Sequence, residues 1–359
     1  MQESKYGDVF KYFKEQEGNI QGIGKVLGKG AFGEVRDIKY KNKIMAAKLI
    51  EKESKEESLE YLLSVDLRGY NIIRTNKIFS KQFRGKFYDL IIMDKAVLRD
   101  IGKLNDFFHH HNLLKLIFEK PFDETCGNTL LRFYARQIVK GLEIIDRNGY
   151  GHFDIKPENL LVTINLVLKI SDFSLLRELK DEMKLPGGTQ GFITPEYYQE
   201  KYFSIDNAKK QDYFALGVCL FILKFGIQMI KVKKYDDKKM IADRILDLIH
   251  RNIMFIKAQK QSDKDFKEFL INLIQYKPEH RLNFEQIYRN KWLNKDIEEL
   301  DKTIMIFESD EEKLIMELQK KDFLIKVEKK IKKNKIKQGR FNFKKNKVSN
   351  FYNKSIQKR

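Results

Sequence analysis

Residues 151–162 read G-H-F-D-I-K-P-E-N-L-L-V, and the fold of the chain is decided around this stretch. It places a carboxylate (Asp154), a cation (Lys156) and a carboxamide (Asn159) on one short segment, and the apolar residues that follow can anchor that segment to a core. Asp154 and Asn159 are five positions apart, which suits a loop better than one face of a helix. The trio fits phosphoryl transfer, which needs a proton acceptor, a cation beside the phosphate and an oxygen ligand for Mg²⁺. Alone, the trio also fits an ordinary polar turn.

The wider motif favours the chemical interpretation, because H-F-D-I-K-P-E-N resembles the catalytic loop of protein kinases. Phe153 stands where most members of that family carry arginine. The resemblance implies that Asp154 orients and deprotonates an acceptor hydroxyl and that Lys156 stabilises the transferring charge. Because K-P-E-N follows the aspartate, in place of the A-A-R-N of tyrosine kinases, the resemblance implies serine or threonine as the acceptor.

The bulk properties are those of a globular protein. The chain of 359 residues is longer than one average domain and suits a two-lobed unit with extensions. It contains no apolar run of about 18 residues, and its first residues, M-Q-E-S-K-Y, lack a charged-then-apolar leader. Cys126 and Cys219 are too few for a disulfide framework. We therefore expect an intracellular protein, cytoplasmic or nuclear, with reduced cysteines.

The net charge of +19 suggests nucleic-acid binding until it is localised. Residues 320–359 hold 16 Lys and Arg against two acidic residues, so most of the excess belongs to this tail. A solvated, disordered tail explains such a run, and the alternatives are nuclear import, contact with anionic membrane or nucleic acid, and docking of acidic partners. Upstream, S-D-E-E at residues 309–312 is a capping-box pattern that predicts the start of a helix.

A glycine triplet near the N-terminus forms G-x-G-x-x-G at residues 28–33. Without Cβ atoms such a backbone can close over a polyphosphate and offer its amide groups. A dinucleotide-binding fold would place the triplet between a strand and a helix, but residues 34–40 alternate like a returning strand, so we expect a hairpin. The kinase resemblance implies that this hairpin covers ATP with Gly28, Lys29, Gly30, Ala31, Phe32, Gly33 and Val35.

Lys48 lies in the apolar run M-A-A-K-L-I, fifteen residues after the last glycine of the triplet. A lysine at the end of a strand is commonly a plain surface charge. The kinase resemblance instead implies that Lys48 anchors the phosphates and is held by a carboxylate from the helix-like residues 54–66. Counting back from residues 71–73 selects Glu60, twelve residues after Lys48, with Glu57 as the alternative.

Residues 86–93, K-F-Y-D-L-I-I-M, predict the last strand of the small lobe, followed by the hinge that borders the adenine pocket. An ordinary strand end would look the same. Asp100, seven residues beyond Met93, is expected to contact the ribose or a basic substrate residue. The contacts that the resemblance implies around the base and sugar are Ala46, Met93, Asp94, Ala96, Asp100 and Leu161.

A later motif, S-D-F-S, resembles the D-F-G motif, with Asp172 thirteen residues after Asn159 and Ser174 in place of glycine. The resemblance implies that Asn159 and Asp172 hold Mg²⁺. Because glycine eases backbone rotation, Ser174 should restrict flipping of Phe173 without removing a metal ligand. The histidines at residues 109–111 also suggest a metal site, but adjacent side chains diverge, so we expect an exposed polar run there.

Two further motifs complete the family order. G-T-Q-G-F-I-T-P-E resembles the end of a kinase activation loop, which implies that Thr189 hydrogen-bonds near Asp154 and that Glu196 pairs with Arg281. D-Y-F-A-L-G-V resembles a motif whose aspartate, here Asp212, fixes the catalytic loop from below.

The activation loop lacks a phosphorylation switch. Phe153 replaces the arginine that would bind a phosphate on this loop. Residues 175–188 contain no Ser, Thr or Tyr that could carry the phosphate. We therefore predict that catalysis does not need phosphorylation of the activation loop.

Together the motifs predict an α+β, two-lobed protein kinase fold, with a small antiparallel sheet and one helix in the N-lobe and a mainly helical C-lobe. The apolar stripe of residues 129–148 predicts the helix that delivers the catalytic loop, and Trp292 is expected to be structural. The expected units are an N-terminal extension without an assigned role (1–19), the N-lobe (20–94), the C-lobe (95–293) and a C-terminal extension (294–359).

The expected activity is transfer of phosphate from ATP, with Mg²⁺, to serine or threonine of a protein substrate. Glu158 and Asp100 suggest a preference for basic substrates. The rival is a pseudokinase, a binding scaffold without chemistry, which Phe153, Ser174 and the short spacing before Glu60 favour. The enzyme is favoured by retention of Lys48, Asp154, Asn159 and Asp172.

Overall fold

The computed structural model describes residues 6–30, 33–53, 67–96, 100–102, 124–163, 167–226, 228–230, 237–260 and 262–295, with the backbone alone at residues 124–130 and 239. These residues belong to one compact unit, Met1–Ile297. Among them, no helix combines the length and the apolar character that crossing a membrane requires. Several predictions concern residues outside the described ranges: Ala31, Phe32, Glu57, Glu60, the histidines at 109–111, the capping box at 309–312 and the basic tail.

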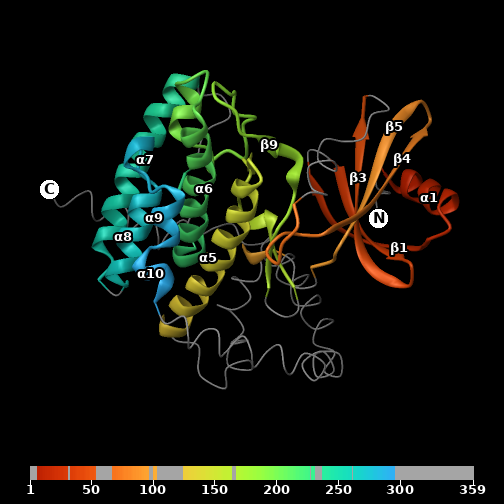
Figure 1. Cartoon of the computed structure of the whole chain (residues 1–359), viewed down its shortest axis with the longest axis horizontal. Helices are drawn as coiled ribbons and strands as arrows, with labels where there is room; N and C mark the ends of the chain where they lie inside the picture. Colours follow the sequence, from red (N-terminus) through yellow and green to blue (C-terminus); the bar gives the residue numbers. More distant parts are fainter. Residues whose placement is uncertain are drawn as a thin grey trace, which may run out of the picture. The chain divides into compact units, whose positions relative to one another are not determined.

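An antiparallel sheet with the strand order β1-β2-β3-β5-β4 forms the N-terminal part of the unit (Figure 1). Its hairpins are tight because the two-residue turns Lys41-Asn42 and Arg84-Gly85 have positive φ at both positions, which matches the twist of the flanking strands. The strands are β1 (Ile20–Gly30), β2 (Gly33–Tyr40), β3 (Lys43–Lys52), β4 (Thr75–Phe83) and β5 (Lys86–Met93).

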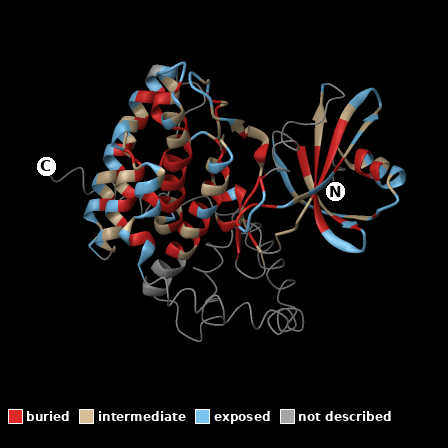
Figure 2. Ribbon diagram, viewed as in Figure 1, coloured by how far each residue is buried: buried red, intermediate tan, exposed pale blue. Residues whose placement is uncertain are grey.

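Helix α1 (Gly7–Gln16) packs against this sheet and buries Val9, Phe10 and Phe13. Their spacing puts them on one side of a helix, a pattern that is visible in the sequence although the segment had no expected role. Figure 2 shows buried residues along α1 and the central strands. The α1 cluster, as we name it, comprises Val9, Phe10, Phe13, Ile20, Ile38, Tyr40, Met45, Ala47, Leu49, Tyr88, Leu90 and Ile92.

A mainly helical region follows, built on α5 (Glu124–Arg147) and α6 (Ile205–Phe225), which pack against each other (Figure 1). Helix α6 begins where the Ser204 side chain accepts from the Asn207 N–H, and it ends at Gly226 with positive φ. The further helices are α7 (Lys238–Ala258), α8 (Lys264–Leu273), α9 (Phe284–Tyr288) and α10 (Lys291–Asn294). Trp292 in α10 is buried, as expected for a structural residue.

A five-stranded antiparallel sheet followed by a helical region confirms the predicted fold class. The strand predicted at residues 86–93 is β5. The long helix begins at Glu124, five residues before the predicted start. The prediction was wrong there because Gly127 and Asn128 have low helix propensity, yet the helix continues through them. The expected unit limits at residues 19, 94 and 293 stay predictions.

Candidate active site

The loop that carries Asp154 is held between two short two-stranded sheets. Before it, β6 (Tyr150–Gly151) pairs with β9 (Arg177–Glu178), and after it β7 (Leu160–Val162) pairs with β8 (Leu168–Ile170). Asp212 of α6 accepts hydrogen bonds from the backbone N–H groups of His152 (2.7 Å) and Phe153 (2.8 Å). The predicted anchoring of the loop by Asp212 is therefore confirmed. Burial raises the pKa of the Asp212 carboxyl to about 7, although the two N–H bonds oppose this.

Several donors converge on the buried carboxylate of Asp154. Its Oδ1 accepts from the Thr189 backbone N–H (3.0 Å) and hydroxyl (2.6 Å), so the predicted bond between these residues is confirmed. Its Oδ2 accepts from Lys156 Nζ (2.6 Å) and Asn159 Nδ2 (3.0 Å). Lys156 Nζ also donates to Thr189 Oγ1 at 2.7 Å. The structure thus brings these four predicted residues into one hydrogen-bonded group.

His152 had no expected role, yet it links the loop to the segment that carries Asp172. Its Nε2 lies 3.2 Å from the carbonyl oxygen of Ser171, and its Nδ1 accepts from the Asp154 N–H at 3.2 Å. Complete burial lowers the pKa of the imidazole. A neutral ring with its proton on Nε2 satisfies both contacts. The sequence shows a histidine beside the loop aspartate, but not that its partner lies nineteen residues away.

Lys48 and Asp172 meet at one ion pair. Lys48 Nζ in β3 lies 2.7 Å from Asp172 Oδ1, just after β8. Burial alone would raise the pKa of the Asp172 carboxyl, but the charge and hydrogen bond of Lys48 outweigh it, and the pKa falls to about 2. Asp172 is therefore ionised at neutral pH. Its backbone has φ +67°, a strained conformation of the kind that gathers at functional sites.

Asn159 and Asp172 supply oxygen atoms of the kind that Mg²⁺ prefers. Both hydrogen bonds that the Asn159 side chain makes to described residues use its amide nitrogen, toward Asp154 O (2.8 Å) and Asp154 Oδ2 (3.0 Å), which leaves the amide oxygen for a cation. Ser171 donates its N–H (2.9 Å) and its hydroxyl (3.0 Å) to the Asn159 carbonyl and so connects the two ligands. This donor set fits Mg²⁺ whose other ligands are phosphate oxygens and water. Among the described residues no group of three or more His, Cys, Asp or Glu could hold a metal by itself.

The hairpin predicted around the glycine triplet is confirmed, because Gly28 pairs with Val35 and Gly30 with Gly33 across β1 and β2. Val35 is in turn the cross-strand neighbour of Lys48 in β3. Ala46, two residues before Lys48 on the same face of β3, is buried. Val35 and Ala46 are therefore direct neighbours of Lys48 in the sheet. Contacts of all these residues with a nucleotide stay predictions.

The predicted hinge follows β5 directly. Met93 pairs with Ala46 in β3, and the Asp94 N–H donates to the Arg74 carbonyl at 3.0 Å. Asp100 is buried and forms an isolated antiparallel bridge with Leu161 in β7. The structure thus brings Asp100 and Leu161 together, and the roles of Asp94, Ala96 and Asp100 toward ATP stay predictions.

Comparison with known proteins decides the family. Residues 22–293 match the family model described as protein kinase domain. The chain belongs to the protein kinase family. The match covers both the sheet and the helical region, so Lys48, Asp154, Asn159 and Asp172 all lie within the kinase domain.

The individual relatives are protein kinases whose sequences are less than 30% identical to this chain. The Aurora kinase of Saccharomyces cerevisiae is 28% identical over 283 residues, covering 76% of this chain and 68% of that protein. Calcium-dependent protein kinase 4 of Plasmodium falciparum is 29% identical over 297 residues, covering 71% and 49%. Serine/threonine-protein kinase MRCK alpha of Homo sapiens is 28% identical over 218 residues, covering 56% and 11%.

The activation segment, by which we mean residues 172–196, packs on Phe153. The ring is buried, and the Phe153 backbone has φ +62°. A Cβ at Gly151 would lie 2.4 Å from the ring, so only glycine fits beneath it. The Phe153 cluster comprises Phe153, Leu185, Phe203 and Ala208, with Leu175, Leu179, Met183 and Tyr197 around them.

The end of the activation segment is anchored by a buried ion pair. Arg281 Nη1 and Nη2 donate to the two carboxylate oxygens of Glu196 at 2.5 and 2.7 Å. The guanidinium also donates to the carbonyls of Gln275 and Tyr276 and lies 5.0 Å from the Phe214 ring centroid. The predicted pairing of Glu196 with Arg281 is therefore confirmed.

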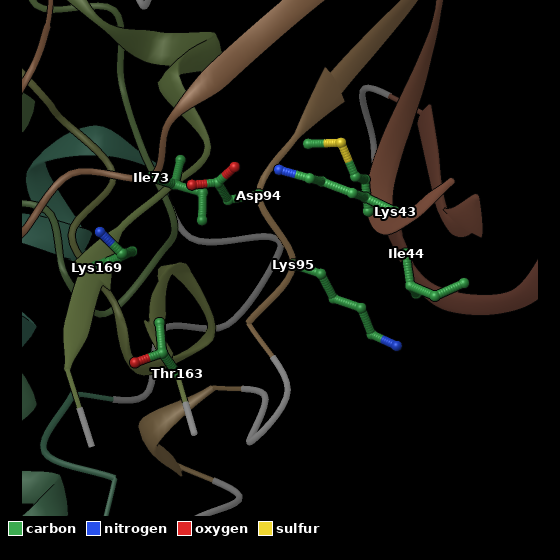
Figure 3. A pocket seen from close by; sticks show the side chains of 8 residues that line it. Lys43, Ile44, Ile73, Asp94, Lys95, Thr163 and Lys169 are labelled. Carbon is green, nitrogen blue, oxygen red and sulfur yellow. The ribbon is translucent and has the colours of Figure 1, made fainter. Parts of the chain in front are cut away.

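A cavity of about 260 Å³ lies beside the hinge residues Asp94 and Lys95 (Figure 3). Figure 3 shows the Lys43 side chain extending toward Asp94. Lys95 Nζ is paired with Asp37 at 2.8 Å, and Lys169 Nζ donates to the Tyr70 carbonyl at 2.8 Å. Neither Lys48 nor any residue of the Asp154 group lines this cavity, which borders the site only at the hinge residue Asp94.

Proposed function

We propose that the chain is a protein serine/threonine kinase that transfers the γ-phosphate of Mg-ATP to hydroxyl groups of a protein substrate. The observation that carries the proposal is the shared network of Lys48, Asp154, Asn159 and Asp172. Lys48 bonds to Asp172, and Asn159 bonds to Asp154. Ser171, next to Asp172, bonds to Asn159. A phosphoryl-transfer site needs these charges in one place, because its catalysis is mainly positioning and electrostatic stabilisation.

Each side chain has a task that its contacts support. Asp154 is the proton acceptor, since its buried carboxylate is held in place by Thr189 and Lys156. Lys156 Nζ lies within hydrogen-bond distance of Asp154 and Thr189 and can stabilise the negative charge of the phosphate during transfer. Asn159 and Asp172 are the ligands for Mg²⁺, which when bound neutralises phosphate charge. Lys48 anchors the phosphates while it fixes Asp172.

Serine or threonine is the proposed acceptor because K-P-E-N follows Asp154. The printed names of relatives such as MRCK alpha include serine/threonine-protein kinase. Glu158, which is exposed beside the catalytic loop, supports a preference for basic substrate residues. A peptide library without any enrichment of Arg or Lys near the acceptor would remove that preference.

Independence from activation-loop phosphorylation is the second part of the proposal. Residues 175–188 contain no Ser, Thr or Tyr. In place of an arginine that binds phosphate, the apolar Phe153 ring packs with Leu185 and Phe203. Burial of apolar side chains therefore holds the activation loop in place, a role that a phosphate–arginine pair would otherwise have.

A pseudokinase is the alternative, and it keeps the fold and the nucleotide site while losing transfer. The test is radiolabel transfer from Mg-ATP to a generic protein, followed by identification of the labelled amino acid. Wild type should label serine or threonine, and Asp154→Ala should lose the label. Nucleotide binding without any transfer by wild type would establish the alternative.

A further inference from the structure

A chain of side-chain contacts connects the glycine turn, by which we mean the described residues 28–30 and 33, to helix α1. Glu34 comes directly after the turn, and its side chain is 1% exposed. Its Oε1 accepts from Arg36 Nε at 2.6 Å, and its Oε2 lies 3.3 Å from Lys29 Nζ in the turn. One buried carboxylate therefore bridges a cation of the turn and a cation of β2.

Arg36 is the better buried of these two cations, with a side chain 17% exposed against 62% for Lys29. Its guanidinium carbon lies 5.0 Å from the centroid of the Phe10 ring in α1. Glu34, Arg36 and Ile38 alternate along β2 and so share one face of the sheet. Ile38 belongs to the α1 cluster, so this face is the one that α1 covers. Phe10 thus provides a platform for the guanidinium that holds Glu34.

Helix α1 is itself fixed to the far edge of the sheet. Lys81 Nζ lies 2.9 Å from Glu17 Oε1, and Arg84 Nη2 lies 3.4 Å from Asp8 Oδ2. The rings of Tyr12 and Phe83 are 4.9 Å apart. These contacts to β4 and to the turn after it, together with the buried residues of the α1 cluster, keep α1 and Phe10 against the sheet.

The turn is also pressed against β3. A Cβ at Gly33, whose φ is +148°, would lie 1.9 Å from the carbonyl oxygen of Leu49, the residue after Lys48. Gly33 is the first residue of β2, so the residue that ends the turn lies against the strand that carries Lys48. This arrangement couples the conformation of the turn to the phosphate anchor.

We propose that α1 is a positioning element for the glycine turn, acting through Phe10, Arg36 and Glu34, and that it thereby sets the affinity for nucleotide. Removal of a buried partner from a buried carboxylate is destabilising, and Arg36 is the more buried of the two cations that contact Glu34. Lys29 is too exposed to replace Arg36 in this role. The statement about nucleotide rests on the proposed function, whereas the statement about the turn does not.

The first test measures hydrogen–deuterium exchange of backbone amides in residues 24–37, in the full chain without nucleotide. Phe10→Leu removes the aromatic face but keeps apolar volume, and Arg36→Met removes the cation but keeps the aliphatic stem. Both variants should exchange faster in this segment than wild type. Phe13→Leu is the matched control, since Phe13 is equally buried in α1 and the same cluster without lying under Arg36. It should leave exchange in this segment unchanged.

The second test measures the Kd for Mg-ADP by calorimetry. Phe10→Leu and Arg36→Met should each weaken binding by about threefold to tenfold, which is the effect of one cation–π contact expressed as affinity. The double variant should be no weaker than the single ones, because both changes break one chain of contacts. Phe13→Leu should bind like wild type.

Equal exchange in all variants, or equal acceleration by Phe13→Leu, would overturn the proposal. A wild type that binds no Mg-ADP would count against the proposed function, and the exchange comparison would still decide the role of α1. If Phe10→Leu does not fold, Arg36→Met gives the same two readouts.

Discussion

Lys48 Nζ and Asp172 Oδ1 lie 2.7 Å apart although 124 residues separate them in the sequence. The contact joins a strand of the N-terminal sheet to the segment after β8. Because Ser171 is bonded to Asn159, the same contact also connects the sheet to the catalytic loop. The charge state of Asp172 therefore depends on a residue from the other part of the kinase domain.

This dependence predicts how pH changes the effect of Lys48→Met on stability. In the folded wild type the Asp172 pKa is about 2, below its value in the unfolded chain, so the pair stabilises the fold above about pH 4 and loses this contribution as pH falls. Loss of Lys48 removes its charge and its hydrogen bond, so burial, which raises the pKa, is then opposed by Ser174 and His152. Lys48→Met should therefore cost about 2 kcal/mol more near pH 6 than at about pH 2, where the pair has lost most of its contribution.

Urea unfolding across this pH range measures the difference. In an Asp172→Asn background, Lys48→Met should show no such pH dependence. A cost of Lys48→Met that stayed constant from acid to neutral pH would show that the two groups do not share a charge interaction.

Thr189 is expected to position Asp154 and Lys156 for the reaction. Its hydroxyl donates to Asp154 Oδ1 and accepts from Lys156 Nζ. Thr189→Val should lower kcat about tenfold with the KM for ATP unchanged, because one hydrogen bond is lost at the reacting groups. Thr189→Ser keeps the hydroxyl and should restore most of kcat. Steady-state kinetics of the three proteins measure this, and a variant that raised only the KM for ATP would contradict the assignment.

Phe153 is expected to hold the activation segment in place of a phosphate. Phe153→Ala should destabilise the chain by about 3–5 kcal/mol, because a large buried ring is removed. Cleavage by thermolysin within residues 175–188 should then be faster than in wild type. Phosphatase treatment of wild type should leave its activity unchanged. Activity that was lost on phosphatase treatment through a site in this loop would overturn the account of activation.

Glu196 and Arg281 are expected to anchor the C-terminal end of the activation segment. Arg281→Met should cost about 3–5 kcal/mol, since it leaves the buried Glu196 carboxylate without its cation. Arg289→Met is the matched control, because the Arg289–Glu285 pair is exposed on α9, and it should change stability by at most about 0.5 kcal/mol. Denaturation followed by Trp292 fluorescence measures both. Equal costs for the two substitutions would show that burial of the pair is not what matters.

Residue patterns and the kinase resemblance predicted different parts of the structure. The glycine hairpin and β5 could be predicted from alternating residues, whereas the Thr189–Asp154 bond and the Glu196–Arg281 pair were implied by the resemblance. Helix α5 could be placed from its apolar stripe, but its start could not, because Gly127 and Asn128 interrupt the pattern.

Contacts between segments that are distant in the sequence could not be predicted where no recognisable motif contains the residues. His152 and Ser171 are small parts of the site whose pairing depends on how two loops meet. The support of Glu34 by Arg36 and Phe10 depends on α1 lying across the sheet, and nothing in the local pattern of β2 shows that. Val9, Phe10 and Phe13 have the spacing of one helix face, but this pattern alone did not show which surface α1 would cover.

The central claim is that Lys48, Asn159 and Asp172 act on one metal-bound triphosphate. Calorimetric titration of ATP with and without Mg²⁺ tests it most directly, in wild type and in Asp172→Asn. Wild type should bind ATP more tightly when Mg²⁺ is present, and Asp172→Asn should lose most of that gain while staying folded. Binding of ATP that ignored Mg²⁺, or a gain from Mg²⁺ that survived Asp172→Asn, would contradict the claim.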